Sequence, residues 1–224
     1  MVFTPAHQDY RAFTAVMGPE AYWEAGNYNL FMMCEKPEAA AFRPLAAGFT
    51  FRLVRPEELD LWKATAVEAP FIPDVSAYFN RVYAGRQEEF FRQAYFLCDG
   101  SGRPSATGLL WKAWGKVSSL GWIRTLPAYE GRGIGRMLLS ALLERAEYPL
   151  FLHTQPTSAR AIKLYSDFGF RLLTDPVVGE RENDLQKSLP LLQKVLPEWD
   201  FAALRTAEAP EWFLEAARSG PSEL

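Results

Sequence analysis

A glycine-rich bend that opens directly onto an amphipathic helix is the feature that most restricts how this chain folds. Residues 129–146 read YEGRGIGRMLLSALLERA, and Pro127 ends the strand-like run before them. Apolar residues at the i, i+3, i+4, i+7 and i+8 positions predict a helix over 134–146. Because glycine has no Cβ, an anion can approach the backbone N–H groups at the start of that helix. The stretch therefore predicts an anion site, with an ordinary tight turn as the alternative.

The spacing of the glycines restricts which anion this is. The dinucleotide fingerprint G-x-G-x-x-G requires a third glycine where this chain has Arg136, and no acidic residue ends the following run FLHTQ. A P-loop requires Gly-Lys-Ser/Thr, which the sequence GRM does not supply. Nicotinamide, flavin and nucleoside triphosphate sites are therefore disfavoured.

Two motifs in order carry a family resemblance. LPAYEGRGIGRMLLSALL, followed by SARAIKLYSDFGF, resembles the GCN5-related N-acetyltransferase (GNAT) superfamily, over roughly residues 48–177. The resemblance implies that acetyl-CoA is the co-substrate and that no metal takes part. It implies that the pyrophosphate is held by the backbone amides of Gly131, Arg132, Gly133, Ile134, Gly135 and Arg136. It also places Ser158 at the asparagine position of the second motif, where a side chain contacts the CoA arm.

The same resemblance implies a fold and a mechanism. The fold is a mixed α/β (α+β) arrangement whose largely antiparallel sheet has two central parallel strands splayed apart, with helices on its faces. Residues 117–127 and 149–155 would be those two strands. Leu126 would donate its backbone N–H to the thioester oxyanion and would also contact the cofactor. Tyr165 would protonate the departing thiolate, with a packed core aromatic as the alternative.

Two positions depart from the family pattern. Glu130 stands where the family has Gln or Arg, and a carboxylate at an exposed helix start disfavours a bound anion by about 0.3–1 kcal/mol. Ser158 replaces an asparagine, although a hydroxyl still contributes one hydrogen bond, worth about 0.5–1.5 kcal/mol net. The departures favour an alternative function, an acyl-CoA-binding sensor or regulatory module without efficient transfer. O-acyl transfer and transfer of a longer chain also stay open.

Composition and charge limit the partners. Twenty-four basic and 27 acidic residues give a net charge of −3, so neither nucleic acid nor an anionic membrane is indicated. No apolar run reaches the roughly 18 residues of a membrane span, which predicts a cytoplasmic protein. Cys34 and Cys98 lie in apolar stretches without metal-site spacing, so we expect reduced, packed thiols.

The expected acceptor is a primary amine of a small molecule or peptide, acetylated by direct attack. A lysine-like amine of pKa about 10.4 is neutral in only roughly 1 molecule in 2,500 at pH 7, so a base assists transfer. Glu68, Asp74 and His153 are the candidates, and each has a structural alternative as a solvated helix-end charge or a satisfied core histidine. Rings between Trp62 and Phe91 are mostly core, although some could line an amine pocket.

The pattern of apolar residues and turn signals predicts the other elements. Strands are expected in YNLFMMCEK, at 49–53, on both sides of the hairpin turn DGSGRP, in FRLLTD and in AALRTAE. Helices are expected from about Glu57, within 59–93, over PTSARAIKLYSDFGF with Gly169 at its end, over 183–196 and in PEWFLEAAR. The predicted domains are an N-terminal extension with an extra strand (1–47), an acetyltransferase domain (48–215; core 48–177, inserted helix 183–196) and a tail (216–224). The extension and the inserted helix could shape the acceptor site or a homodimer contact.

Overall fold

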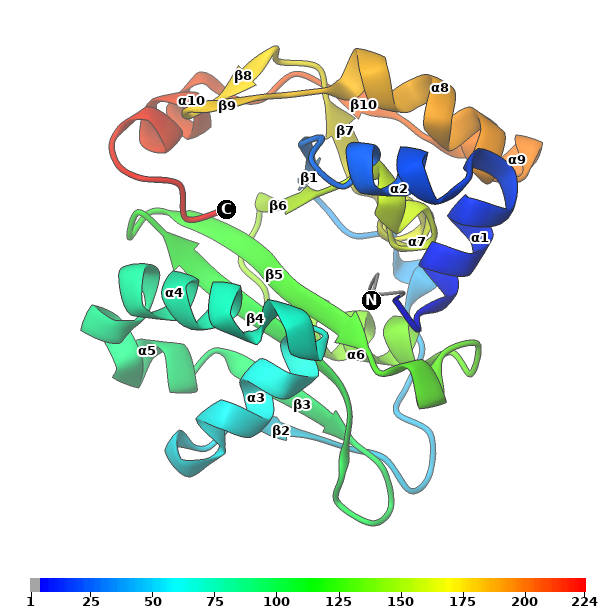
Figure 1. Ribbon diagram of the computed structural model, residues 1–224. Coiled ribbons are helices and arrows are strands. Elements are labelled where there is room, and N and C mark those ends of the chain that lie inside the picture. Colours follow the sequence, from blue (N-terminus) through cyan, green and yellow to red (C-terminus); the bar gives the residue numbers. More distant parts are fainter. Residues whose placement is uncertain (1–4) are drawn as a thin grey trace. The chain divides into compact units, whose positions relative to one another are not determined.

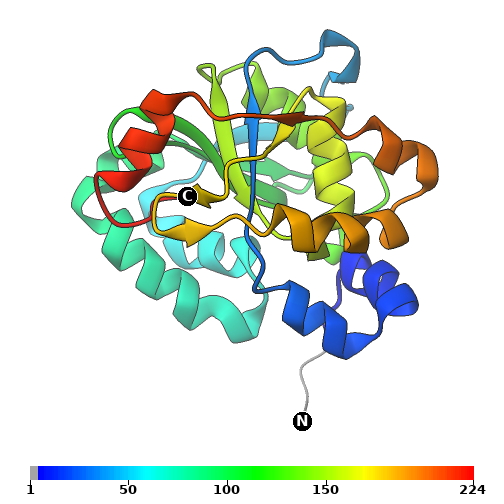
Figure 2. The same ribbon diagram turned by 90° about the horizontal axis from the view of Figure 1, so that it is seen from above.

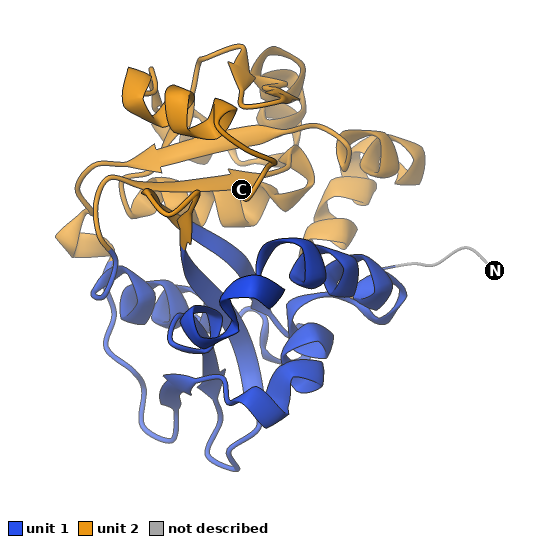
Figure 3. Ribbon diagram, turned by 90° about the vertical axis from the view of Figure 1, so that its left-hand side faces the viewer, with its two compact units in different colours: residues 1–5, 42–111, 120–146 blue, residues 6–41, 112–119, 147–224 orange. Residues whose placement is uncertain are grey.

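A computed structural model describes residues 5–224, in which groups of helices and groups of strands follow one another along the chain (Figure 1). Residues 1–4 of the predicted N-terminal extension lie outside the described part. The chain divides into two compact units (Figure 3). Unit 1 holds Pro5, Phe42–Trp111 and Leu120–Ala146, and unit 2 holds Ala6–Ala41, Lys112–Ser119 and Glu147–Leu224. The predicted domain boundary after residue 47 differs from the boundaries of these compact units, and it stays a prediction.

The strands of unit 1 form an antiparallel run. They are β2 (Thr50–Leu53), β3 (Ala94–Cys98), β4 (Pro104–Ala113) and β5 (Val117–Thr125), of which β4 and β5 begin or end in unit 2. β2 pairs with β3, and β3 with β4, both antiparallel. The predicted hairpin turn is confirmed, because the Asp99 N–H donates to the Arg103 carbonyl at 2.9 Å.

Helices cover both faces of these strands. They are α3 (Leu59–Ala66), α4 (Ile72–Val82), α5 (Gln87–Phe91) and α6 (Ile134–Leu143). A Cβ on Gly108 would lie 2.6 Å from Leu142 Cδ1, so α6 packs closely against that face of β4. Trp111 points to the other face, where its ring meets Tyr83 at 4.8 Å. Figure 1 accordingly shows α4 in front of the strands and α6 behind them.

The helix α6 is shorter and more deeply buried than the sequence predicts. It ends at Leu143 rather than at residue 146, and every residue from Met137 to Leu143 is buried. The segment that precedes β2 packs against α6. There the Arg43 N–H donates to Ser140 Oγ at 2.9 Å and the Ala46 N–H lies 3.3 Å from Met137 Sδ.

An N-terminal strand lies in the middle of the strands of unit 2. β1 (Leu30–Cys34) pairs antiparallel with both β6 (Leu150–Thr154) and β7 (Arg171–Leu173), as Figure 2 shows. All five β1 residues are buried. β10 (Thr206–Ala207) runs parallel to β7, and β5 pairs parallel with β6 at Ser119 and Phe151. The predicted mixed sheet with flanking helices is confirmed, and the predicted extra strand is central.

The remaining elements of unit 2 bring three corrections. The helices are α1 (Gln8–Met17), α2 (Pro19–Ala25), α7 (Ala159–Asp167), α8 (Leu185–Val195), α9 (Glu198–Ala203) and α10 (Glu211–Arg218), and a hairpin is formed by β8 (Val177–Val178) and β9 (Arg181–Glu182). Neither the N-terminal helices nor the hairpin were predicted. The strand expected in AALRTAE shrinks to two residues, because α9 takes its start.

Candidate active site

The predicted site residues fall into two groups. Leu126 and the loop from Gly131 to Arg136 belong to unit 1, whereas Ser158 and Tyr165 belong to unit 2. Each group is built by its own local structure.

The glycine loop has the backbone geometry that its sequence predicts. A 3-10 turn at Pro127–Tyr129 leads into Gly131 and Gly133, whose φ values of +76° and +77° lie in the left-handed region. Gly133 is the N-cap residue of α6, and no side chain caps that helix. A Cβ built on Gly133 meets nothing within 4 Å. The first turn of α6 therefore has no side-chain cap, and the space beside Gly133 is open, as an anion cradle requires.

Ile134 fixes the loop to the core while the glycines stay exposed. Its side chain is buried at the first position of α6, and Gly131, Arg132 and Gly133 are exposed. The fit to a pyrophosphate rests on this combination of an anchored helix start, uncapped amides and positive-φ glycines. The sequence predicts the glycine bend and the helix that begins at Ile134, because both depend on local residue chemistry, whereas the positive φ values and the absence of a cap come from the structure.

The Leu126 prediction meets an obstacle in the structure. The Leu126 N–H donates to the Ser105 carbonyl at 2.9 Å, so this amide is already used between strands. The backbone of β5 is instead irregular at Trp122, whose φ of +53° lies in the left-handed region that a tryptophan rarely adopts. An oxyanion donor at Leu126 would have to give up its bond to Ser105.

An aromatic cluster holds Trp122 in this conformation. Its Nε1–H donates to the Tyr83 hydroxyl at 2.9 Å, and its ring packs edge-on against Trp62 and Tyr78, with centroids 5.7 and 5.4 Å away. Trp62 is fully buried, whereas Trp122 and Tyr78 are partly exposed. The expectation that most of these rings are core is confirmed for Trp62, Phe79 and Phe90.

Glu68 is engaged by an arginine. Arg124 Nη1 donates to the Thr65 and Val67 carbonyls at 3.0 and 2.9 Å, and its Nη2 lies 3.8 Å from Glu68 Oε1. Burial lowers the pKa of Arg124, partly offset by the charge of Glu68. The arginine thus closes the C-terminal end of α3, and Glu68 serves as its counter-ion.

Tyr165 is buried in unit 2. Only 6% of the residue is exposed, and its ring lies 5.8 Å from that of Phe170. Burial raises the pKa of Tyr165, and the charge of Asp9 on α1 adds to the effect. The hydroxyl therefore stays protonated near neutral pH, which is the state that a general acid needs and equally the state of a core tyrosine.

Ser158 keeps its hydroxyl available. It occupies the N-cap position of α7, but no side chain caps this helix. The Ser158 N–H donates to the Gln155 carbonyl at 2.9 Å. Within residues 5–224 the hydroxyl has no hydrogen-bond partner.

His153 has the features of a structural histidine. Its Nε2 lies 2.9 Å from Asn29 Oδ1, and Arg181 Nη1 approaches its Nδ1 at 3.2 Å. A neutral ring that donates from Nε2 and accepts at Nδ1 satisfies both contacts. Burial, and then the charge of Arg181, lower the pKa of His153 to about 3. The satisfied core histidine is therefore the better interpretation.

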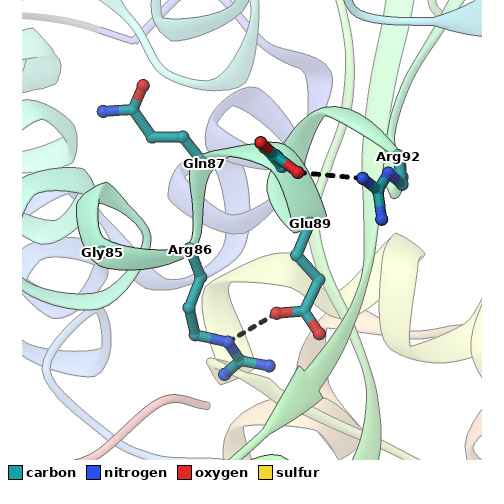
Figure 4. Close-up of a pocket in the computed structure, with 6 residues that line it drawn as sticks. Gly85, Arg86, Gln87, Glu89 and Arg92 are labelled. Carbon is teal, nitrogen blue, oxygen red and sulfur yellow. Dashed lines mark hydrogen bonds and ion pairs between the residues drawn. The ribbon is translucent and has the colours of Figure 1, made fainter.

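Other parts of the described chain offer little further chemistry. Residues 5–224 contain no cluster of three His, Cys, Asp or Glu side chains able to hold a metal ion. A hollow of about 510 Å³ is lined by residues 85–89 and Arg92, around α5 (Figure 4). Arg86 pairs with Glu89 there and Arg92 with Glu88, so its charges are matched internally. None of the predicted site residues line it.

A family comparison decides the assignment. The model of the acetyltransferase (GNAT) family matches residues 59–170, which is half of the 224 residues. The chain belongs to the GNAT acetyltransferase family. The matched segment includes β3 to β6, α6 and α7, and hence the glycine loop and Tyr165. The resemblance inferred from the two motifs is confirmed.

Solved structures give distant likenesses. An acetyltransferase of the GNAT family from Colwellia psychrerythraea is 15% identical, with a TM-score of 0.47 over 64% of this chain and 52% of that one. A GCN5-related N-acetyltransferase from Kribbella flavida is 16% identical, with a TM-score of 0.37 over 57% of this chain and 47% of that one. The chain thus spans about half the length of these proteins. A comparison with curated proteins found no match.

The cysteines have the environment that the sequence predicts. Cys34 and Cys98 are free and buried, and burial raises the pKa of Cys34 to about 12, as expected for packed thiols. No helix in the described part of the chain combines the length and the apolar character that crossing a bilayer requires.

Proposed function

We propose that this GNAT-family protein is an acetyl-CoA-dependent N-acetyltransferase that acts on a primary amine of a small molecule or peptide. The observation that carries the proposal is the start of α6, where uncapped amides follow two glycines at positive φ. Such amides supply charge-assisted hydrogen bonds to a pyrophosphate without any reorganisation. Gly131 to Arg136 would hold the pyrophosphate, and the free hydroxyl of Ser158 would contact the CoA arm.

In this proposal acetyl-CoA supplies the activated acyl group and the amine attacks its thioester carbonyl directly. Tyr165, whose pKa burial raises, would give its proton to the departing thiolate, and the resulting tyrosinate, a stronger base for the same reason, would take the proton that the acylated nitrogen loses. The ammonium must first lose a proton, and neither the ion-paired Glu68 nor the neutral His153 is suited to take it. We assign that step to solvent or to Asp74, which is exposed in the first turn of α4.

A second function is favoured by one observation. The Leu126 amide is already bonded to Ser105, so the predicted oxyanion donor would be lacking while the glycine loop stays intact. A protein with this loop and no donor would bind acyl-CoA without efficient transfer, as a sensor or regulatory module. Cytoplasmic location is part of both proposals.

Calorimetric titration with acetyl-CoA, CoA, NAD and ATP tests the binding step. The expected result is saturable binding of acetyl-CoA and CoA, with no binding of NAD or ATP. An amine panel with detection of released thiol then separates the two functions. Turnover on an amine supports the transferase, and tight binding without turnover on any amine supports the module. Absence of binding by acetyl-CoA would refute both.

A further inference from the structure

The turn between β3 and β4 is tied to the glycine loop by one carboxylate. Asp99 Oδ1 accepts from the Ser101 N–H at 2.9 Å, from Ser101 Oγ at 2.7 Å and from the Arg103 N–H at 3.1 Å. Asp99 Oδ2 accepts from the Tyr129 hydroxyl at 2.5 Å. These bonds lower the pKa of Asp99 well below its usual range, with the Tyr129 bond as the largest cause. Tyr129 and the backbone of Arg103 are therefore held by the same side chain.

Tyr129 in turn lies against an arginine of the glycine loop. The Arg132 guanidinium carbon sits 5.9 Å from the centre of the Tyr129 ring, within the range of a cation–π contact. Hydrogen bonding to Asp99 raises the pKa of Tyr129, and the charges of Arg103 and Arg132 act on that hydroxyl in the opposite direction. The Arg132 guanidinium thus lies against Tyr129, and the Arg103 backbone N–H is bound by the carboxylate that also binds the Tyr129 hydroxyl.

These two arginines differ from the ion-paired Arg86 and Arg92 of unit 1, although Arg55 and Arg81 are likewise without a carboxylate within 4.0 Å among residues 5–224. Arg86 and Arg92 pair with Glu89 and Glu88 at 2.6 and 3.0 Å. Arg103 and Arg132 are exposed, and neither has a carboxylate within 4.0 Å among residues 5–224. Asp99 makes no side-chain contact with either guanidinium but keeps its single negative charge, so two positive charges accompany one negative charge at this turn. The pair is therefore a local excess of positive charge.

We propose that Arg103 and Arg132, positioned through Asp99 and Tyr129, bind the 3′-phosphate of coenzyme A and make the protein distinguish it from 3′-dephospho-coenzyme A. The inference rests on the proposed function, which places the pyrophosphate on the adjacent loop amides. Coenzyme A carries a second phosphate on its ribose, separate from the pyrophosphate, and a guanidinium fork matches its oxygens. Arg103 comes from a turn outside the family motif, so this contact is additional to the glycine cradle.

The test compares the affinities of acetyl-CoA and 3′-dephospho-acetyl-CoA by calorimetry, in wild type, Arg103→Gln and Tyr129→Phe. Wild type is expected to prefer acetyl-CoA. Arg103→Gln should weaken acetyl-CoA about threefold to tenfold, as for a largely exposed phosphate contact, and leave the dephospho form unchanged. Tyr129→Phe, which removes the bond to Asp99, should also reduce the preference. Arg92→Gln, an exposed arginine of the same unit, is the matched control and should change neither affinity.

Each outcome bears on one proposal or on both. Equal wild-type affinities for the two nucleotides would overturn the phosphate site and leave the proposed function standing. Parallel weakening of both nucleotides by Arg103→Gln would also overturn it, because the lost contact would then not involve the 3′-phosphate. Failure of wild type to bind either nucleotide would refute the proposed function and this inference together.

Discussion

Replacing Gly133 by alanine separates the cost of backbone strain from the loss of an anion cradle. Gly133 has φ +77°, and an added Cβ meets nothing within 4 Å. The substitution therefore introduces no clash within the protein, and its effect on folding is the cost of a left-handed alanine, about 1–2 kcal/mol. For a chain of this size each kcal/mol corresponds to a fall of about 2–4 °C in Tm. We expect Tm to drop by about 2–8 °C.

The effect on ligand binding should be larger than the effect on folding. The new methyl group would occupy the space through which a phosphate reaches the first-turn amides of α6, and it would break at least one charge-assisted hydrogen bond. Such a bond is worth about 1.5–3 kcal/mol, or about a tenfold to 150-fold loss of affinity for acetyl-CoA. Calorimetric titration measures the affinity, and thermal unfolding without ligand measures the strain.

Gly115 provides a matched control for this substitution. It has φ +70°, and a Cβ there also meets nothing within 4 Å, but it lies in the turn between β4 and β5. Gly115→Ala should lower Tm by a similar amount and leave the affinity for acetyl-CoA unchanged. The reasoning is refuted if Gly133→Ala binds acetyl-CoA as wild type does, or if both variants weaken binding equally.

Three further substitutions test the side chains. Tyr165→Phe should lower kcat at every pH from 6 to 9, since burial keeps this hydroxyl protonated throughout; an unchanged kcat would leave Tyr165 a core residue. His153 has a folded-state pKa of about 3, below its ordinary value of about 6.5, so the unfolded chain takes up the proton first as the pH falls. Its share of stability is complete above pH 6.5 and should fall by about 2 kcal/mol at pH 5 in urea unfolding. His153→Gln should flatten that dependence, and a slope identical to wild type would contradict the assignment. Arg124→Ala should lower the free energy of unfolding by about 2–4 kcal/mol, because two carbonyls at the end of α3 and Glu68 lose their partner; Arg124→Lys should recover part of this, and full stability in the alanine variant would disprove the capping role.

Local chemistry explains which predictions succeeded. The glycine loop, the start of α6 and the end of α7 at Gly169 all depend on residues close together in sequence, such as a positive φ that favours glycine. The hairpin at DGSGRP was found for the same reason. The sequence also showed Asp99 as a turn residue, but it could not show that its second oxygen binds Tyr129, thirty residues later.

Long-range pairing explains most of what was missed. The engagement of the Leu126 amide by Ser105 depends on the register between two strands, which no local pattern determines. The N-terminal helices α1 and α2 bury only Phe13, Tyr22 and Ala25. The N-cap of α1 is also unusual, because a histidine side chain, that of His7, accepts from the Tyr10 N–H. So few buried apolar residues give the sequence no clear helical period. Trp122, with its positive φ, was hidden because tryptophan is not a residue that normally signals a break in a strand.

The position of β1 has a consequence for how the protein is synthesised. β1 leaves the ribosome before both of its hydrogen-bonded neighbours, β6 and β7, which are encoded more than a hundred residues later. Its buried residues Leu30–Cys34 must therefore stay unpaired until those later strands have been made. Contacts so far apart in sequence slow folding and leave apolar segments open to aggregation. Unit 2 can thus complete its fold only after β6 and β7 have been made, and a nascent chain held before β6 would be the species that most needs a chaperone.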